Sequence, residues 1–162
     1  LKALPRGLEV EIINIENSGV LTLPSDLKAT QIQMKKSKIR EVPDFGDREI
    51  SFLDASGSRV KKILHKNFKN LILRKSDIDD DSLPDGLKSD TLDLTNTQLT
   101  RLPSGLSVGT LILAGTSTTS LPADAQVSKI VPSNFFKKKK KPPASNESVS
   151  LFRALVREVL HL

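Results

Sequence analysis

Hydrophobic residues recur along this chain in a fixed order within units of 19 to 21 residues. The clearest unit has leucine at positions 87, 92, 94, 99 and 102, with mainly polar residues between. Two leucines separated by one residue, as at Leu92 and Leu94, have the period of a short strand, so both side chains point to one face. The pattern therefore predicts one short strand in each unit, with its aliphatic pair directed into a core.

An aliphatic-proline pair marks each repeat. The pairs are Leu4-Pro5, Leu23-Pro24, Val42-Pro43, Leu83-Pro84, Leu102-Pro103 and Leu121-Pro122. Successive pairs start 19 residues apart except for one gap of 41, which Ile63-Leu64 divides as a degenerate pair without proline. Because proline interrupts helices and central strands, we expect extended or single-turn backbone at these points. The repeat predicts about seven stacked coils, the last one incomplete.

A hydroxyl side chain follows the second strand position by three residues in each complete coil. These residues are Ser18, Ser37, Ser58, Ser76, Thr97 and Thr116. A hydroxyl both donates and accepts hydrogen bonds, so it can satisfy backbone groups inside a turn. We expect the six hydroxyls to form a ladder inside the solenoid, in preference to being ordinary turn residues.

Residues 92–103, LDLTNTQLTRLP, combine all of these features. Their order resembles the short leucine-rich repeat of bacterial proteins, and the resemblance covers about residues 4–132. It implies an α/β leucine-rich-repeat solenoid with a parallel β-sheet on the concave face and an extended or single-turn convex side. Ser or Thr stands where those repeats usually have Asn, which is a departure from the family pattern.

Such repeats are familiar from type III secreted effectors, including the novel E3 ubiquitin ligase effectors, where the solenoid recognises host proteins. The resemblance implies a protein-protein interaction module of a secreted virulence effector, acting in the host cytoplasm or nucleus. One alternative is the substrate-recognition half of a ubiquitin ligase whose catalytic domain lies outside this sequence. The other is a lipid or nuclear targeting element in the basic tail. Because a repeat is already under way at Leu4, we also expect further sequence upstream.

The predicted sheet directs the residue between each aliphatic pair, and its flanking residues, toward solvent. On this concave face we expect a partner to contact Gln33, Lys35, Phe52, Asp54, Ile72, Arg74, Asp93 and Ile112. Exposed apolar residues beside an arginine are typical of the centre of an interface. In the irregular third coil, a register slip of one residue would instead bury Phe52 and expose Leu53.

The net charge of +6 is concentrated in a tail that follows the repeats. Its basic residues are Lys137, Lys138, Lys139, Lys140 and Lys141, and without them 20 basic residues face 19 acidic ones. This run is typical of a nuclear-import signal, of a contact with anionic lipid, or of a solvated linker. A second basic cluster, between Lys35 and Lys75, fits either an acidic partner or a solvated edge.

The chain divides into three predicted regions. Residues 1–132 form the solenoid, residues 133–146 form a basic, proline-containing linker, and residues 147–162 form a C-terminal α-helix. The helix is predicted because Phe152, Leu155, Val156 and Val159 share one helical face. We expect it to cap the open end of the solenoid, although it could also begin a further domain or pair with a second copy.

No catalytic motif is present, and we expect this chain to have no enzymatic activity, cofactor or metal. Cysteine is absent, which excludes thiolate chemistry and the ligase nucleophile. The acidic run from Asp77 to Asp81 lacks the glycine and terminal glutamate of a calcium loop. His65 and His161 have no second ligand at metal-binding spacing, so each is interpreted as a surface or packing residue. The absence of Trp and Tyr disfavours nucleic acid as a partner.

Overall fold

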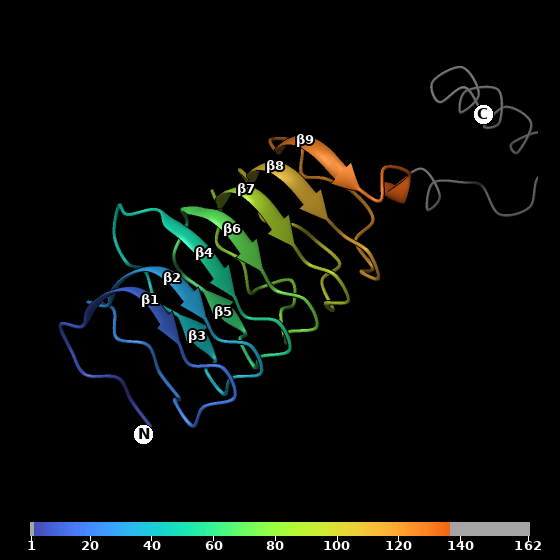
Figure 1. Ribbon diagram of the computed structural model, residues 1–162. Coiled ribbons are helices and arrows are strands. Elements are labelled where there is room, and N and C mark those ends of the chain that lie inside the picture. The colour runs from blue at the N-terminus through green and yellow to red at the C-terminus, as the bar shows by residue number, and fades with distance from the viewer. Residues whose placement is uncertain (1, 137–162) are drawn as a thin grey trace, which may run out of the picture.

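Residues 2–136, which the computed structural model describes, form a solenoid of parallel strands (Figure 1). Seven strands make one sheet in the order β1-β2-β4-β6-β7-β8-β9, which corresponds to about six full turns. The strands are β1 (Glu9–Asn14), β2 (Lys28–Gln33), β4 (Ile50–Asp54), β6 (Phe68–Ile72), β7 (Lys88–Asp93), β8 (Ser107–Ile112) and β9 (Gln126–Val131). The prediction of one strand per repeat in a parallel sheet is confirmed.

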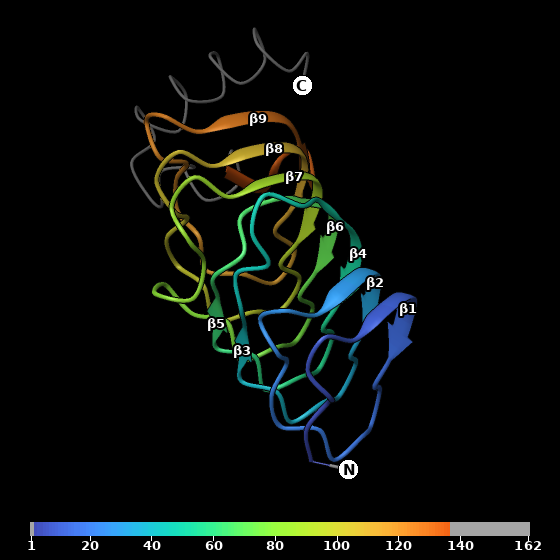
Figure 2. The same cartoon turned by 90° about the vertical axis from the view of Figure 1, so that its left-hand side faces the viewer.

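A second, two-stranded sheet lies on the opposite wall of the solenoid (Figure 2). It pairs β3 (Glu41–Val42) with β5 (Lys62–Ile63). Val42 belongs to the last aliphatic-proline pair before the gap of 41 residues, and Ile63 belongs to the degenerate pair within that gap. The other connections between the strands of the main sheet consist of turns and irregular extended segments. Units of this length have no room for a helix, so the extended connections agree with the sequence prediction.

The strands pair so that equivalent repeat positions stand side by side. Leu92 of β7 pairs with Leu71 of β6 and with Leu111 of β8, and all three are fully buried. In the third coil, Leu53 is fully buried whereas Phe52 keeps part of its surface on the outside. The alternative register that would bury Phe52 and expose Leu53 is therefore wrong.

The core is a continuous stack of side chains between the two walls. The aliphatic positions predicted from the repeat, such as Met34, Ile39 and Leu99, are buried. Residues three positions before each aliphatic pair also point inward, among them Ala29, Ile50 and Val108. Full burial of one large aliphatic side chain contributes about 1.5–3 kcal/mol, so the repeated stack is the main source of stability.

The predicted hydroxyl positions are inside the turns, but they bond within their own coil. The side-chain oxygens of Ser76, Thr97 and Thr116 donate to the carbonyl oxygen three residues earlier, at 2.6, 2.8 and 2.8 Å. The hydroxyl of Ser58 instead accepts from the backbone N–H of Val60. These hydroxyls satisfy local turn groups as expected, whereas within residues 2–136 the buried Ser37 hydroxyl has no hydrogen-bond partner. The bonds that form stabilise each turn separately instead of linking one coil to the next.

Two phenylalanines lie at the C-terminal end of the described chain. Phe135 is buried and Phe136 partly buried against the core, and their rings meet edge to face with centroids 5.1 Å apart. The core therefore continues beyond residue 132, into the segment predicted as a linker. The described residues do not include Lys137–Lys141 or the predicted helix at 147–162. The α component of the predicted fold class depended on that helix.

Candidate functional site

The outward-pointing residues of the main sheet form a surface that we name the sheet face. Its first row is Ile12, Gln31, Phe52, Asn70, Thr91, Thr110 and Lys129, and its second row is Asn14, Gln33, Asp54, Ile72, Asp93, Ile112 and Val131. A third row, just past the strand ends, is Glu16, Lys35, Ser56, Arg74, Thr95 and Ala114. The sheet face brings together all eight residues predicted to contact a partner.

Apolar side chains interrupt the polar rows near the centre of the sheet face. Ile72 lies on β6, which is the fourth of the seven strands, and it is half-buried. Phe52 on the neighbouring strand and Ile112 two strands away are also half-buried. Ile12 near the N-terminal edge is 51% exposed, a site residue that the sequence reasoning missed although it occupies the same row as Phe52.

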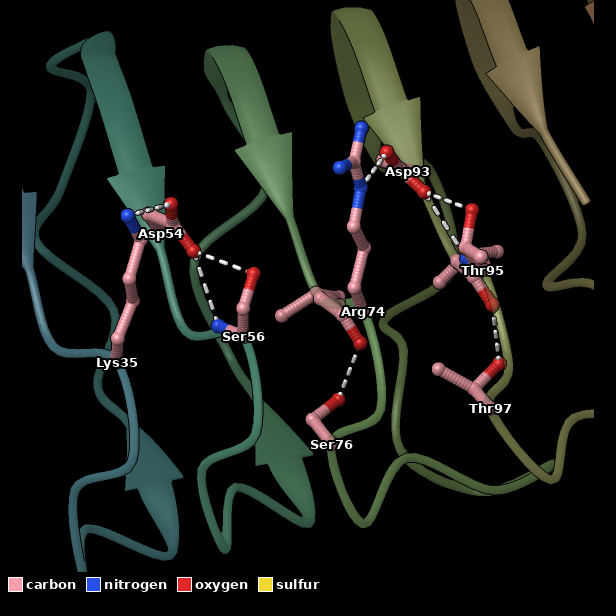
Figure 3. Close-up of polar contacts among 10 residues, drawn as sticks. Lys35, Asp54, Ser56, Arg74, Ser76, Asp93, Thr95 and Thr97 are labelled. Atoms are coloured by element: carbon pink, nitrogen blue, oxygen red, sulfur yellow. Dashed lines mark hydrogen bonds and ion pairs between the residues drawn. The ribbon is translucent and has the colours of Figure 1, made fainter.

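Asp93 lies in the predicted row of the sheet face but is fully buried. Its Oδ1 accepts hydrogen bonds from the backbone N–H of Thr95 at 3.0 Å and from the Thr95 hydroxyl at 2.5 Å. Its Oδ2 accepts from Nε of Arg74, whose side chain crosses from the preceding coil and covers the carboxylate (Figure 3). The expectation that Asp93 offers its carboxylate to a partner is corrected: Asp93 positions Arg74.

Asp54 repeats this arrangement two strands away. Its Oδ1 accepts from the N–H of Ser56 at 3.0 Å and from the Ser56 hydroxyl at 2.6 Å, and Nζ of Lys35 lies 3.4 Å from its Oδ2 (Figure 3). Asn14 likewise accepts from the N–H two residues later. Short side chains that bond this N–H close a turn at the strand end. Asp54, also buried, is therefore a turn residue that holds Lys35, not a free acidic contact.

A sequence signal for this arrangement is visible once the structure is known. Both buried aspartates begin an Asp-x-Ser/Thr triplet, at residues 54–56 and 93–95. A hydroxyl two residues after an aspartate can add a second bond to the same carboxylate. At these two strand ends, the triplet accompanies an aspartate that is bonded within its own turn.

The acidic run on the opposite wall is also used structurally. Asp80 accepts hydrogen bonds from the hydroxyl and N–H of Thr100 and from the N–H of Arg101, in the next coil. These bonds, led by the Thr100 hydroxyl, lower the pKa of Asp80 to about 2. Among residues 2–136, no group of three or more acidic, histidine or cysteine side chains is arranged to hold a metal ion.

His65, which was predicted to be a surface or a packing residue, is a packing residue. The ring is fully buried between the rings of Phe45 and Phe68, with centroids 5.4 and 5.1 Å away. Asp44 Oδ1 lies 3.3 Å from its Nδ1. The N–H of Gly46, which donates to Asp44 Oδ1, lowers the pKa of Asp44. Because this cluster lies within the core and at its rim, it stabilises the irregular coils.

Protein-family models, curated proteins and solved structures were compared with this chain, and none of them matches. Within residues 2–136, no helix has the length and apolar composition needed to cross a membrane. The geometry of the sheet face, together with the repeat pattern, is therefore the basis for a functional proposal.

Proposed function

We propose that this chain is a protein-binding module and that its partner binds the sheet face around Ile72. The position of Ile72 carries the proposal, because an aliphatic side chain stands in the outward row of the central strand. Phe52 and Ile112 extend the apolar area along the sheet. Protein interfaces commonly have an apolar centre surrounded by polar groups.

Fixed basic groups near Ile72 support the same proposal. Ile72 lies between Asp54 and Asp93 in the row, and these two aspartates hold Lys35 and Arg74. Arg74 uses Nε for this bond while its side chain remains 56% exposed, so its terminal amino groups are available to a partner. A side chain held in place before binding loses less conformational entropy on association.

The repeat pattern supports a narrower proposal. The order of aliphatic pair, polar turn residue and aliphatic-proline pair resembles that of the short bacterial leucine-rich repeat, although a hydroxyl stands where Asn is usual, and we propose that the solenoid is of this type. On that basis we propose that the sheet face recognises a host protein as the target-binding part of a secreted effector. Any catalytic activity of such an effector would belong to residues outside this chain.

A cross-linking capture experiment tests the proposal. The unmodified chain and an Ile72→Asp, Ile112→Asp double variant are used as baits in a host-cell extract, after circular dichroism shows that both are folded. The control bait is Ser117→Asp, Thr119→Asp, which adds the same charge at exposed positions of the coil that contains Ile112. We expect the sheet-face variant alone to lose the captured protein. Equal capture by all three baits would overturn the proposal.

A further inference from the structure

Four basic side chains gather on the wall opposite the sheet face, in two adjacent coils. They are Lys38, Arg40, Arg59 and Lys61, which we name the basic edge, and all four are exposed. The backbone joins the two coils here, with the N–H of Arg59 bonded to Ser37 O at 3.2 Å and that of Lys61 to Arg40 O at 2.8 Å.

The alternation of side chains places these four cations on the same side. Ile39 and Val60 point into the core between them and are fully buried, so the residues before and after each point outward. Lys38 therefore stands beside Arg59, and Arg40 beside Lys61, at the spacing of adjacent strands, about 4.8 Å. Like charges this close repel one another, which favours binding of an anionic group.

No ion pair within residues 2–136 neutralises the basic edge. Other basic residues of the solenoid do have carboxylate partners, as Lys28 has Glu9, Arg74 has Asp93 and Arg101 has Asp80. The exposed acidic residue nearest in register is Glu41, which pairs through the backbone with Lys62. The basic edge thus concentrates four cations beside the single carboxylate of Glu41, and none of the four is ion-paired within residues 2–136.

An apolar hollow adjoins the basic edge. It has a volume of about 500 Å³, and its lining consists of Leu21, Thr22, Leu23, Lys38, Arg40, Glu41 and Pro43. Leu21 is 45% exposed, although most large apolar residues of the solenoid are buried. A hollow of this size accommodates one or two aliphatic side chains, which a simple inorganic or sugar polyanion does not have.

We propose that the basic edge and this hollow together bind an acidic segment of a second protein. Its carboxylates face the four cations, and one of its aliphatic side chains enters the hollow beside Leu21. A protein segment fits better than a lipid surface, because a bilayer contacts apolar groups that protrude from a protein and not ones that line a hollow. Nucleic acid fits less well, because no aromatic ring lines the hollow for stacking on bases.

The basic edge directly precedes β3 and β5, which lie on the wall opposite β6, the strand of Ile72 (Figure 2), so this interaction is separate from the one proposed for the sheet face. One solenoid would then contact two surfaces of a partner, or two partners together. A substitution that removes one interaction should leave the other intact, since each depends on residues that the other does not use.

Binding of a defined peptide to the full chain tests this inference. The probe is a fluorescein-labelled peptide of repeated Glu-Asp-Leu units, and anisotropy reports its affinity. We expect Lys38→Glu, Arg59→Glu to weaken binding at least about tenfold and added salt to weaken it further. Replacing leucine by serine in the peptide, or Leu21→Ser in the chain, should also weaken binding severalfold, since each removes apolar burial.

Three matched controls separate this site from general attraction of charge. The first, Lys88→Glu, Lys129→Glu, makes the same charge change at exposed positions of β7 and β9. The second replaces Lys137–Lys141 by serine. The third, Ile72→Asp, tests independence from the sheet face. We expect each to alter affinity much less than the Lys38, Arg59 variant. The proposal is overturned if the Lys88, Lys129 variant weakens binding equally, or if the tail variant abolishes binding that the Lys38, Arg59 variant retains.

A vesicle experiment addresses the competing partner. Phosphatidylserine vesicles are mixed with the full chain, with phosphatidylcholine vesicles as the uncharged comparison. We expect no binding that depends on both Leu21 and Arg59. Vesicle binding lost in both Leu21→Ser and Arg59→Glu, with no such loss for the peptide, would identify a membrane-binding edge and overturn the acidic-segment proposal.

Discussion

The imidazole of His65 accepts a hydrogen bond from the backbone N–H of Phe45, with Nδ1 and the amide nitrogen 3.2 Å apart. Its other nitrogen, Nε2, lies 3.0 Å from the carbonyl oxygen of Asn67 and donates to it. A ring that accepts at Nδ1 and donates at Nε2 has its hydrogen on Nε2. One buried polar side chain therefore joins the two irregular coils, where aliphatic-proline spacing is lost.

We expect His65 to have its ring hydrogen on Nε2, as its two hydrogen bonds require. Long-range ¹⁵N–¹H correlation spectra report the tautomer, and a His161→Gln variant assigns the two histidines. His65→Ala should destabilise the fold by about 2–4 kcal/mol, because it creates a cavity and leaves the Phe45 N–H without an acceptor. Lys66→Ala, at the exposed neighbouring position, should change stability by less than about 0.5 kcal/mol. Equal effects of the two substitutions would show that the ring is not structural.

Asp80 should make the stability of the solenoid sensitive to acid. Its pKa is about 2 in the folded chain and is ordinarily near 3.8. The bonds to Thr100 and Arg101 therefore contribute fully above about pH 4 and are lost as pH falls toward 2. In urea unfolding, we expect the stability difference between the unmodified chain and Asp80→Asn to shrink across this interval. A difference that stays constant from pH 7 to pH 2 would contradict the assignment.

The pair Arg74 and Asp93 should couple more strongly than Lys35 and Asp54. Removing Arg74 leaves a fully buried carboxylate with one fewer donor, whereas Lys35 is about half exposed and lies 3.4 Å from its partner. Double-mutant cycles with alanine in urea unfolding should give about 1–3 kcal/mol for the first pair and about 0.2–1 kcal/mol for the second. The reverse order of the two coupling energies would contradict the geometry described here.

Gly109 should be intolerant of a side chain for a steric reason. A methyl group there would lie 2.7 Å from the carbonyl oxygen of Asp90 in the adjacent strand, closer than van der Waals contact allows. We expect Gly109→Ala to destabilise the fold by about 1–3 kcal/mol, measured by thermal or urea unfolding. Ser128→Ala is the matched control at the equivalent register position of β9, and it should be nearly neutral. If both substitutions are neutral, β7 and β8 are spaced more widely than described.

The repeat alone was sufficient to predict the strands and the aliphatic core. Leu53 and Leu71 follow the same two-residue spacing as Leu92, and that spacing survives even in the coils with insertions. Because a parallel solenoid stacks equivalent positions, one correct register predicts the neighbours in every coil. Phe135 was missed because it follows the last strand, where the repeat offers no further periodicity.

The polar part of the sheet face was only partly predictable. The rows containing Arg74 and Asp93 follow from strand alternation, but the burial of Asp93 does not. The burial of Asp93 depends on the side chain of Arg74, which reaches over from the preceding coil, 19 residues earlier. His65 was similarly obscure, since its bonding partners Phe45 and Asn67 come together only after two insertions have been accommodated. Local spacing contains little information about such contacts between coils.

Isothermal titration of the captured protein, once purified, tests recognition by the sheet face most directly. The protein is titrated into the unmodified chain, into Ile72→Asp, and into Lys38→Glu, Arg59→Glu, each shown to be folded. If Ile72 is at the interface centre, its substitution should weaken binding about a hundredfold, equivalent to about 2.7 kcal/mol. The basic-edge variant should bind more tightly than Ile72→Asp. Unchanged affinity of Ile72→Asp would contradict recognition by the sheet face.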